Sequence, residues 1–218
     1  MITVMLVDDQ SVVRAGFRVI LEQAGDIEVV GEASSGSTAV ELARRLRPEV
    51  ICMDVRMPGG DGLTATRRII TEAVGSPPAV LVVTTFDLDE YVFGALESGA
   101  SGFILKDCEP EELIEAVRRL ADGQGLVDQA VTRRVIAEFA RRTPAPATDA
   151  AAAHQLTARE VEIIGLLARG LSNVEIADEL FIETSTVKSH LGRAMAKIGV
   201  RDRLQTVVWA YRNGVAPR

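Results

Sequence analysis

The chain has 218 residues, of which 47% are hydrophobic and 25% charged, so it is long enough for two soluble domains with ordinary cores. No apolar run approaches the roughly 20 residues of a membrane-spanning helix, no secretory signal is recognisable, and two cysteines are too few for a disulfide framework or a cysteine-based zinc site, so we expect a cytoplasmic protein. The net charge of −7 is uneven, because residues 1–122 carry 11 Lys and Arg against 21 Asp and Glu whereas residues 155–218 carry 9 against 7, which indicates different partners for the two ends without establishing nucleic-acid binding.

Residues 1–122 alternate short apolar runs with amphipathic segments, a pattern typical of an α/β domain. The apolar runs predict strands at residues 2–7, 27–33, 50–53, 79–84 and 102–105. The other segments predict helices at residues 11–24, 37–46, about 61–70, 89–98 and 111–121. This alternation implies a doubly wound (βα)5 domain with a parallel, flavodoxin-like sheet and right-handed crossovers.

One edge of this sheet is expected to collect the reactive side chains, because all parallel strands end there. Asp8 and Asp9 follow the first strand, and Asp54 follows the third. Thr84 and Lys106 stand at the ends of the fourth and fifth. Taken alone, Asp54 would as readily be a turn former or a helix cap, and Lys106 an ordinary strand-end lysine. Their convergence in one pocket favours a site.

The chemistry of such a pocket follows from its charges. Neighbouring carboxylates repel one another and need a cation, and oxygen-only ligands favour Mg²⁺. With Mg²⁺ bound, the pocket would hold a phosphoryl group beside Asp54, whose carboxylate could attack in line to give an acyl phosphate. Thr84 could then donate a hydrogen bond to the phosphoryl oxygen, and Lys106 could pair with it as a point charge.

The chain changes character after the fifth helix. A further helix is expected at about residues 128–142, and residues 143–154 are rich in Pro, Ala and Thr without large apolar side chains, which predicts a linker. We therefore expect a first domain at residues 1–122, a linker at residues 123–154 that includes this helix, and a second domain at residues 155–218.

The second domain is expected to be a bundle of four helices. Two capping boxes, Thr157 with Glu160 and Ser172 with Glu175, start its first two helices. A short turn at residues 181–183 leads into a third helix at residues 184–198, and a fourth is expected at residues 203–213. Two short helices joined by a tight turn within such a bundle indicate a helix-turn-helix.

The third helix of this domain has two faces when its residues are laid out at about 100° each. One face is apolar and contains Val187, Leu191, Ala194 and Ile198. The opposite arc is polar and basic and contains Ser185, Thr186, Lys188, Ser189, Arg193 and Lys197, with Gly192 and Ala196 in its middle and His190 at its border. On an arbitrary helix this arc would be a solvated surface, but after a helix-turn-helix it favours entry into the major groove of DNA. On the fourth helix, Val207, Val208 and Trp209 could form a dimer face or pack inside the bundle.

Five motifs stand out in the first domain: Leu6-Val7-Asp8-Asp9, Met53-Asp54-Val55-Arg56-Met57-Pro58, Asp61-Gly62, Thr84 and Lys106-Asp107. With them, residues 1–122 resemble the receiver domain of two-component response regulators, and the stretches at 84–87 and 100–106 resemble its NarL/FixJ branch. The resemblance implies that Asp54 accepts phosphate from a sensor histidine kinase. It implies that Asp9, Asp54 and the carbonyl of Arg56 ligate Mg²⁺, with Asp8 acting mainly through water. Thr84 and Phe103 would form a switch pair, in which the hydroxyl moves toward the phosphate and the ring turns inward.

The second domain carries the strings LTAREVE at 156–162, GLSN at 170–173, EIA at 175–177, TVKSHL at 186–191 and KIGV at 197–200. With these, residues 155–217 resemble the LuxR-type (GerE) DNA-binding domain. The resemblance implies base contacts from Lys188, Ser189 and position 192, and phosphate contacts from Thr186, His190 and their neighbours. Two positions depart from the family pattern. Glu183 replaces the usual serine cap, so we expect Thr184 to cap instead, and Gly192 replaces an often basic residue, which moves weight to Arg193.

Together, the two resemblances predict a response regulator of the NarL/FixJ family that is switched by phosphorylation, forms a homodimer and binds double-stranded promoter DNA. The dimer would use the face near Phe103 or the helix at residues 11–24, and RNA polymerase is a further candidate partner, whereas no membrane partner is expected. The chain would not be an enzyme apart from its own phosphorylation and dephosphorylation at Asp54. One alternative is a phosphorylation-independent DNA-binding regulator whose receiver-like half is a dimerisation module. Another is a phosphatase or phosphotransferase that uses the same acidic pocket.

Overall fold

The computed structural model describes residues 1–57, 62–84, 94–95, 97–123 and 155–216. The chain divides into two compact units, with the division near residue 126. The predicted helix at 128–142, the linker at 143–154 and most of the predicted helix at 89–98 lie outside the described residues. No helix in the described part of the chain is both long and apolar enough to cross a membrane.

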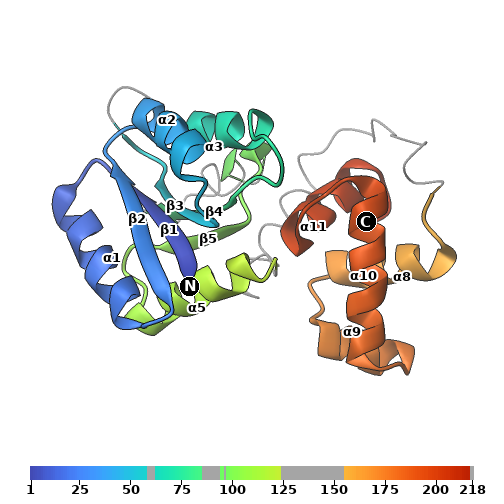
Figure 1. Ribbon diagram of the computed structural model, residues 1–218. Helices are drawn as coiled ribbons and strands as arrows, with labels where there is room; N and C mark the ends of the chain where they lie inside the picture. Colours follow the sequence, from blue (N-terminus) through green and yellow to red (C-terminus); the bar gives the residue numbers. More distant parts are fainter. Residues whose placement is uncertain (58–61, 85–93, 96, 124–154, 217–218) are drawn as a thin grey trace. The chain divides into compact units, whose positions relative to one another are not determined.

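The first unit is built on a five-stranded parallel sheet (Figure 1). Its strands are β1 (Ile2–Val7), β2 (Ile27–Ala33), β3 (Val50–Asp54), β4 (Ala79–Thr84) and β5 (Gly102–Leu105). They lie in the order β2-β1-β3-β4-β5, so the direction of winding reverses between β1 and β3. This confirms the predicted doubly wound fold, in which ligands bind where the strand order reverses.

Helices cover both faces of this sheet. Figure 1 shows α1 (Ser11–Gln23) and α5 (Pro110–Ala121) on one face, and α2 (Gly36–Leu46) and α3 (Gly62–Thr71) on the other. Because strand side chains alternate between faces, each layer has its own core. The core under α1 and α5 contains Val4, Leu6, Cys52, Leu81, Leu113 and Val117. Every residue of β3 is buried, which is expected for the central strand of a sheet covered twice.

The second unit contains the four predicted helices: α8 (Ala158–Ala168), α9 (Asn173–Leu180), α10 (Thr184–Ile198) and α11 (Arg203–Arg212). Both predicted capping boxes form, one at the start of α8 and one at the start of α9. The predicted cap of α10 is wrong, because Thr184 is already the first helical residue. Glu183 occupies the cap position without a side-chain cap bond, while its carbonyl accepts from the N–H groups of Thr186 and Val187.

The core of the second unit takes in the apolar side of α11. Val207 and Val208 are 5% and 4% exposed, and Trp209 packs against the cluster that contains Ile164 and Ala194. Val207 and Val208 therefore pack inside the bundle. Trp209 is only partly buried, and a dimer face on this helix stays a prediction.

Candidate functional site

Three carboxylates, those of Asp8, Asp9 and Asp54, form an acidic cluster at the carboxyl edge of the sheet. One oxygen of each lies within 4.8 Å of those of the other two. The register explains their meeting, because Val7 pairs with Met53, so Asp8 and Asp54 follow directly from paired positions of β1 and β3. Asp8 and Asp54 are only 4% and 5% exposed, whereas Asp9 is exposed. The cluster thus has two buried charges and one that faces solvent.

Lys106 bridges the two buried carboxylates of this cluster. Its Nζ lies 2.6 Å from Oδ2 of Asp8 and 3.0 Å from Oδ2 of Asp54. Burial alone would lower the pKa of Lys106, but its bonds to the two carboxylates outweigh burial and raise it. Burial also raises the pKa of Asp54, and the bond from Lys106 opposes that shift only in part. Lys106 is therefore an internal counter-ion and not an ordinary strand-end lysine.

The backbone around Asp54 holds its carboxylate in place. Oδ1 of Asp54 accepts from the N–H of Val55 at 2.8 Å. The chain then returns, and the N–H of Gly62 donates to the carbonyl of Val55 at 3.0 Å. A Cβ placed on Gly62 would lie 1.9 Å from the carbonyl oxygen of Asp54, so only glycine allows α3 to start this close to β3.

The other residues assigned to the first domain occupy three different positions. Thr84 ends β4 at the same edge, is 2% exposed, and its carbonyl accepts from the N–H of Lys106 at 2.8 Å. Phe103 lies further back, where it pairs with Val82, and it is 5% exposed, so its ring is buried in this structure. Arg56 follows β3 and is exposed.

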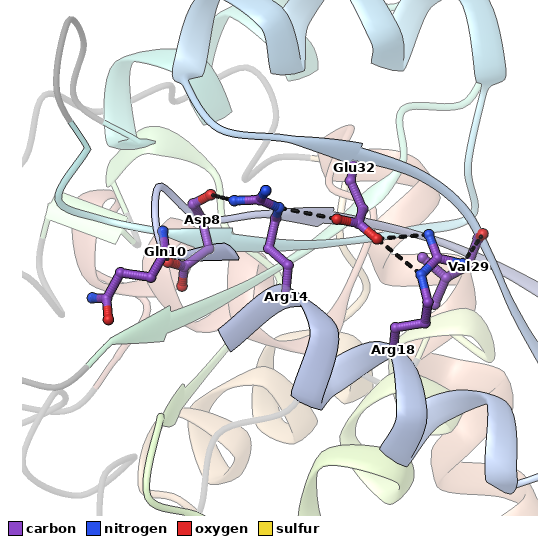
Figure 2. Close-up of polar contacts among 6 residues, drawn as sticks. All are labelled: Asp8, Gln10, Arg14, Arg18, Val29 and Glu32. Atoms are coloured by element: carbon purple, nitrogen blue, oxygen red, sulfur yellow. Dashed lines mark hydrogen bonds and ion pairs between the residues drawn. The ribbon is translucent and has the colours of Figure 1, made fainter. Parts of the chain in front are cut away.

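A network of charged side chains from α1 and β2 holds the end of β1, which carries Asp8 of the acidic cluster (Figure 2). Arg14 donates to the carbonyl of Asp8 at 2.7 Å and to Glu32 at 3.0 Å, while Arg18 bonds the other oxygen of Glu32 at 2.8 Å. The N–H of Gln10 donates to Oδ1 of Asp8 at 2.9 Å. The network thereby fixes α1 and β2 against the end of β1. Sequence reasoning missed it, because only the topology places Glu32 next to residues one turn apart on α1.

The second candidate site is the polar arc of α10. Val187, Leu191 and Ala194 are buried, whereas Ser185, Lys188, Ser189, Gly192 and Arg193 are exposed, as the two-faced layout predicts. Thr186 and His190 lie at intermediate depth. Nε of Arg193 donates to the carbonyl of Ser189 at 3.3 Å, which lays this guanidinium along the helix.

Lys197 differs from the rest of this arc. Its Nζ donates to both carboxylate oxygens of Glu160, at 3.0 and 2.7 Å. Glu160 is 2% exposed and also accepts from the N–H of Thr157 in the capping box of α8. Sequence reasoning identified Glu160 only as a capping residue, because nothing in the local pattern signals a partner 37 residues away.

Comparison with known proteins identifies both domains. The sequence matches the response regulator receiver domain over residues 4–118 and the luxR family of bacterial regulatory proteins over residues 154–210. It is 41% identical over 213 residues to the transcriptional regulatory protein LiaR of Bacillus subtilis, covering 98% of each chain. It is 35% identical over 213 residues to the nitrate/nitrite response regulator protein NarL of Escherichia coli K12, covering 98% of this chain and 96% of that one.

Solved structures show the same similarity along the chain. The crystal structure of the response regulator ChrA, from a heme-sensing two-component system, aligns with a TM-score of 0.53 and 36% identity, covering 98% of both chains. The receiver domain of a response regulator NarL from Mycobacterium tuberculosis aligns with a TM-score of 0.54 and 36% identity, covering 56% of this chain and 98% of that one.

Proposed function

We propose, from the premise that this chain belongs to the two-component response regulators that join a receiver domain to a LuxR-type DNA-binding domain, that it is a transcription factor switched by phosphorylation of Asp54. The observation that carries the proposal is the meeting of Asp8, Asp9, Asp54 and Lys106 at one edge of the sheet. The same chain presents a basic arc on the second helix of a helix-turn-helix.

The acidic cluster fits Mg²⁺. Its ligand atoms are all oxygens within coordinating reach of one another, and the two buried carboxylates already require a positive charge, which Lys106 provides. Asp9, Asp54 and the carbonyl of Arg56 would hold the ion, with Asp8 acting through water. Bound there, Mg²⁺ would offset the negative charge of the carboxylates and of an incoming phosphoryl group.

The phosphoryl donor is a phosphohistidine of a sensor histidine kinase. An oxygen of Asp54 attacks the phosphorus, the phosphorus–nitrogen bond breaks, and the imidazole leaves with the electron pair. The N–H of Val55 and the ammonium of Lys106 hold the carboxylate during this step. The phosphoryl group carries a charge of about −1.5 to −2 in place of the single charge of the carboxylate, so Lys106 is drawn from Asp8 toward the phosphoryl oxygens. Thr84, at the same edge, donates to them.

The output of the switch is a change in assembly and in DNA binding. Movement of Thr84 and repacking near Phe103 shift the population toward a homodimer, and two linked DNA-binding domains gain affinity for two half-sites. On each α10, Lys188 and Ser189 read bases, Thr186 and His190 contact phosphates, and Arg193 takes over from position 192. Promoter DNA as the target implies action in the bacterial cytoplasm, where RNA polymerase is a further partner.

The proposal is tested by adding acetyl phosphate and Mg²⁺ while measuring the oligomeric state and the affinity for a duplex selected from a random-sequence library. The wild type is expected to dimerise and bind more tightly, and Asp54→Asn is expected to do neither. Asp26→Asn serves as the matched control, because Asp26 pairs with Arg118 away from the cluster. An equal response of Asp54→Asn would refute phosphorylation at this residue. Tight DNA binding that is the same with and without acetyl phosphate would instead support the phosphorylation-independent regulator.

A further inference from the structure

Lys197 and Glu160 form an ion pair within the second unit, in which the glutamate is buried and the lysine partly exposed. The carboxylate of Glu160 is 3% exposed and receives bonds from Lys197 on both oxygens. The whole side chain of Lys197 is 34% exposed. Burial alone would raise the pKa of Glu160, but the bonds from Lys197 and from the capping box hold it below its usual value. The carboxylate is thus charged, and Lys197 is its charged partner.

The pair joins α8, the helix that precedes the helix-turn-helix, to the far end of α10. Glu160 stands in the first turn of α8, and Lys197 stands in the last turn of α10. The first half of α10 is held by apolar contacts instead, because Val187 and Leu191 belong to the same core cluster as Ile176 of α9. The second half of α10 also has an apolar contact, because Ala194 shares a cluster with Ile164 of α8. The angle of α10 is therefore set by α9 at one end, and at the other by α8 through this contact and the Glu160–Lys197 pair.

Lys188 offers the contrast on the same helix. It is exposed, and within the described residues its ammonium takes part in no ion pair or hydrogen bond that the structure records. A lysine free in this way can neutralise a DNA phosphate and release counterions. Lys197 could do so only by weakening its bonds to a buried carboxylate, which would then keep the N–H of Thr157 but lose its charged partner, and this is costly because a buried charge without a counter-ion loses its solvation.

We propose that Lys197 is a positioning residue, which acts through Glu160 to set the angle at which α10 enters the major groove and which makes no phosphate contact of its own. The proposal rests on the DNA binding proposed for α10. It predicts that loss of the pair lowers the discrimination between DNA sequences. A small rotation of α10 would displace side chains from base edges, while the remaining cations would stay near the DNA phosphates.

The experiment compares Lys197→Met with Lys188→Met in the full chain, since both remove one charge from α10. Affinity is measured over a range of salt concentrations for a duplex selected by the wild type and for a scrambled duplex of equal length. Lys197→Met is expected to lower the ratio of the two affinities by about tenfold and to leave the salt dependence of scrambled binding unchanged. Lys188→Met is expected to reduce the slope of log affinity against log salt by about 0.9 per bound domain.

Two results for Lys197→Met would overturn the proposal. A reduced slope like that of Lys188→Met would show a phosphate contact. Unchanged affinities with only a lower melting temperature would show a merely structural role. Failure of the wild type to select any duplex would instead refute DNA binding itself, and both proposals with it.

Glu160→Gln is a second test, for which a positioning role and a phosphate contact predict opposite changes in DNA binding. It decides between them if Lys197→Met does not fold. It keeps the side-chain length and the acceptor for the N–H of Thr157. The positioning role predicts that Glu160→Gln lowers the ratio of selected to scrambled affinity. The single variant Lys197→Arg, which keeps the charge, should retain most of the wild-type ratio. If Lys197 were a phosphate contact, Glu160→Gln would release it and give tighter binding with a steeper salt slope.

Discussion

The bridge from Lys106 to Asp8 and Asp54 dominates the electrostatics of the acidic cluster. The two aspartate side chains are buried, with 6% of each exposed, and that of Lys106 is 9% exposed. Lys106→Met leaves two carboxylates facing each other and is expected to cost about 3 kcal/mol of unfolding free energy at neutral pH. Mg²⁺ should restore more stability to this variant than to the wild type, because in the variant no ammonium competes for the cluster. Thermal unfolding with and without Mg²⁺ checks this, and an equal Mg²⁺ effect in both proteins would contradict it.

Gly62 is the residue that lets α3 begin beside the acidic cluster. Gly62→Ala would place a Cβ 1.9 Å from the carbonyl oxygen of Asp54, and because that oxygen is backbone it cannot turn aside. The end of β3 must then move, which is expected to lower stability by roughly 1–3 kcal/mol and to slow phosphorylation of Asp54. Gly25→Ala is not a matched control because its φ is positive, but Gly16→Ala is, since nothing lies within 4 Å of its added Cβ. Normal phosphorylation of Gly62→Ala would show that the end of β3 tolerates the displacement.

The pair of Glu160 and Lys197 also predicts a pH dependence. The folded protein holds the pKa of Glu160 below its ordinary value of 4.5, so the pair stabilises fully above that pH and its contribution is lost as the pH falls. The difference in unfolding free energy between the wild type and Glu160→Gln should be largest at neutral pH and should narrow below about pH 4.5. The only tryptophan, Trp209 on α11, gives a fluorescence signal from this unit. A difference that stays constant with pH would mean that Glu160 is not the titrating group.

Sequence reasoning found individual residues where topology dictates their meeting. Asp8, Asp54 and Lys106 were predictable because the ends of parallel strands share one edge. Two relations were not predictable. The bonds of Arg14 to Asp8 and Glu32, and those of Lys197 to Glu160, join side chains whose separation in space depends on helix angles that no local pattern encodes.

Among the elements, α10 combines the polar arc proposed to bind DNA with a glycine in its middle. Gly192 lies in the helix interior and is exposed, and a Cβ added there would meet nothing within 4 Å. Gly192→Ala is therefore expected to raise the stability of the second unit by about 1 kcal/mol through helix propensity. Denaturant unfolding followed by Trp209 fluorescence measures this gain. No gain would show that the helix around position 192 is not regular in solution.

The bounds of the strands and helices followed the hydrophobic pattern closely, because apolar runs and capping boxes are local signals. β3 extends one residue beyond its prediction, to include Asp54, since the ladder with β4 continues to Val83. α10 begins at Thr184 as predicted, but its predicted cap was wrong, because the extended backbone of Glu183 supplies the first carbonyl while its side chain makes no cap bond. Backbone geometry decided that position, and a search for a capping side chain could not.

In the molecule as a whole, two units with separate hydrophobic cores should unfold in two steps. Among the described residues, the core under α1 and α5 and the two clusters of the second unit share no residue. Scanning calorimetry is expected to show Mg²⁺ raising one transition and duplex DNA raising the other, because each ligand stabilises only the unit that binds it. Phosphorylation of Asp54 should then alter the DNA-dependent transition in the wild type. A single transition that both ligands shift equally would mean that the units unfold as one.

Because β3 is paired on both sides, the number of residues in the strand decides where Asp54 lies. Val50 to Met53 are matched residue by residue to β1 and β4, and all are buried. Deleting one residue within this strand would carry the aspartate into the core or leave Met53 at the edge, whereas conservative substitutions at the same positions keep the count. Functional variants should therefore tolerate conservative substitutions in β3 but no insertions or deletions. The length of this strand constrains function more than its composition does.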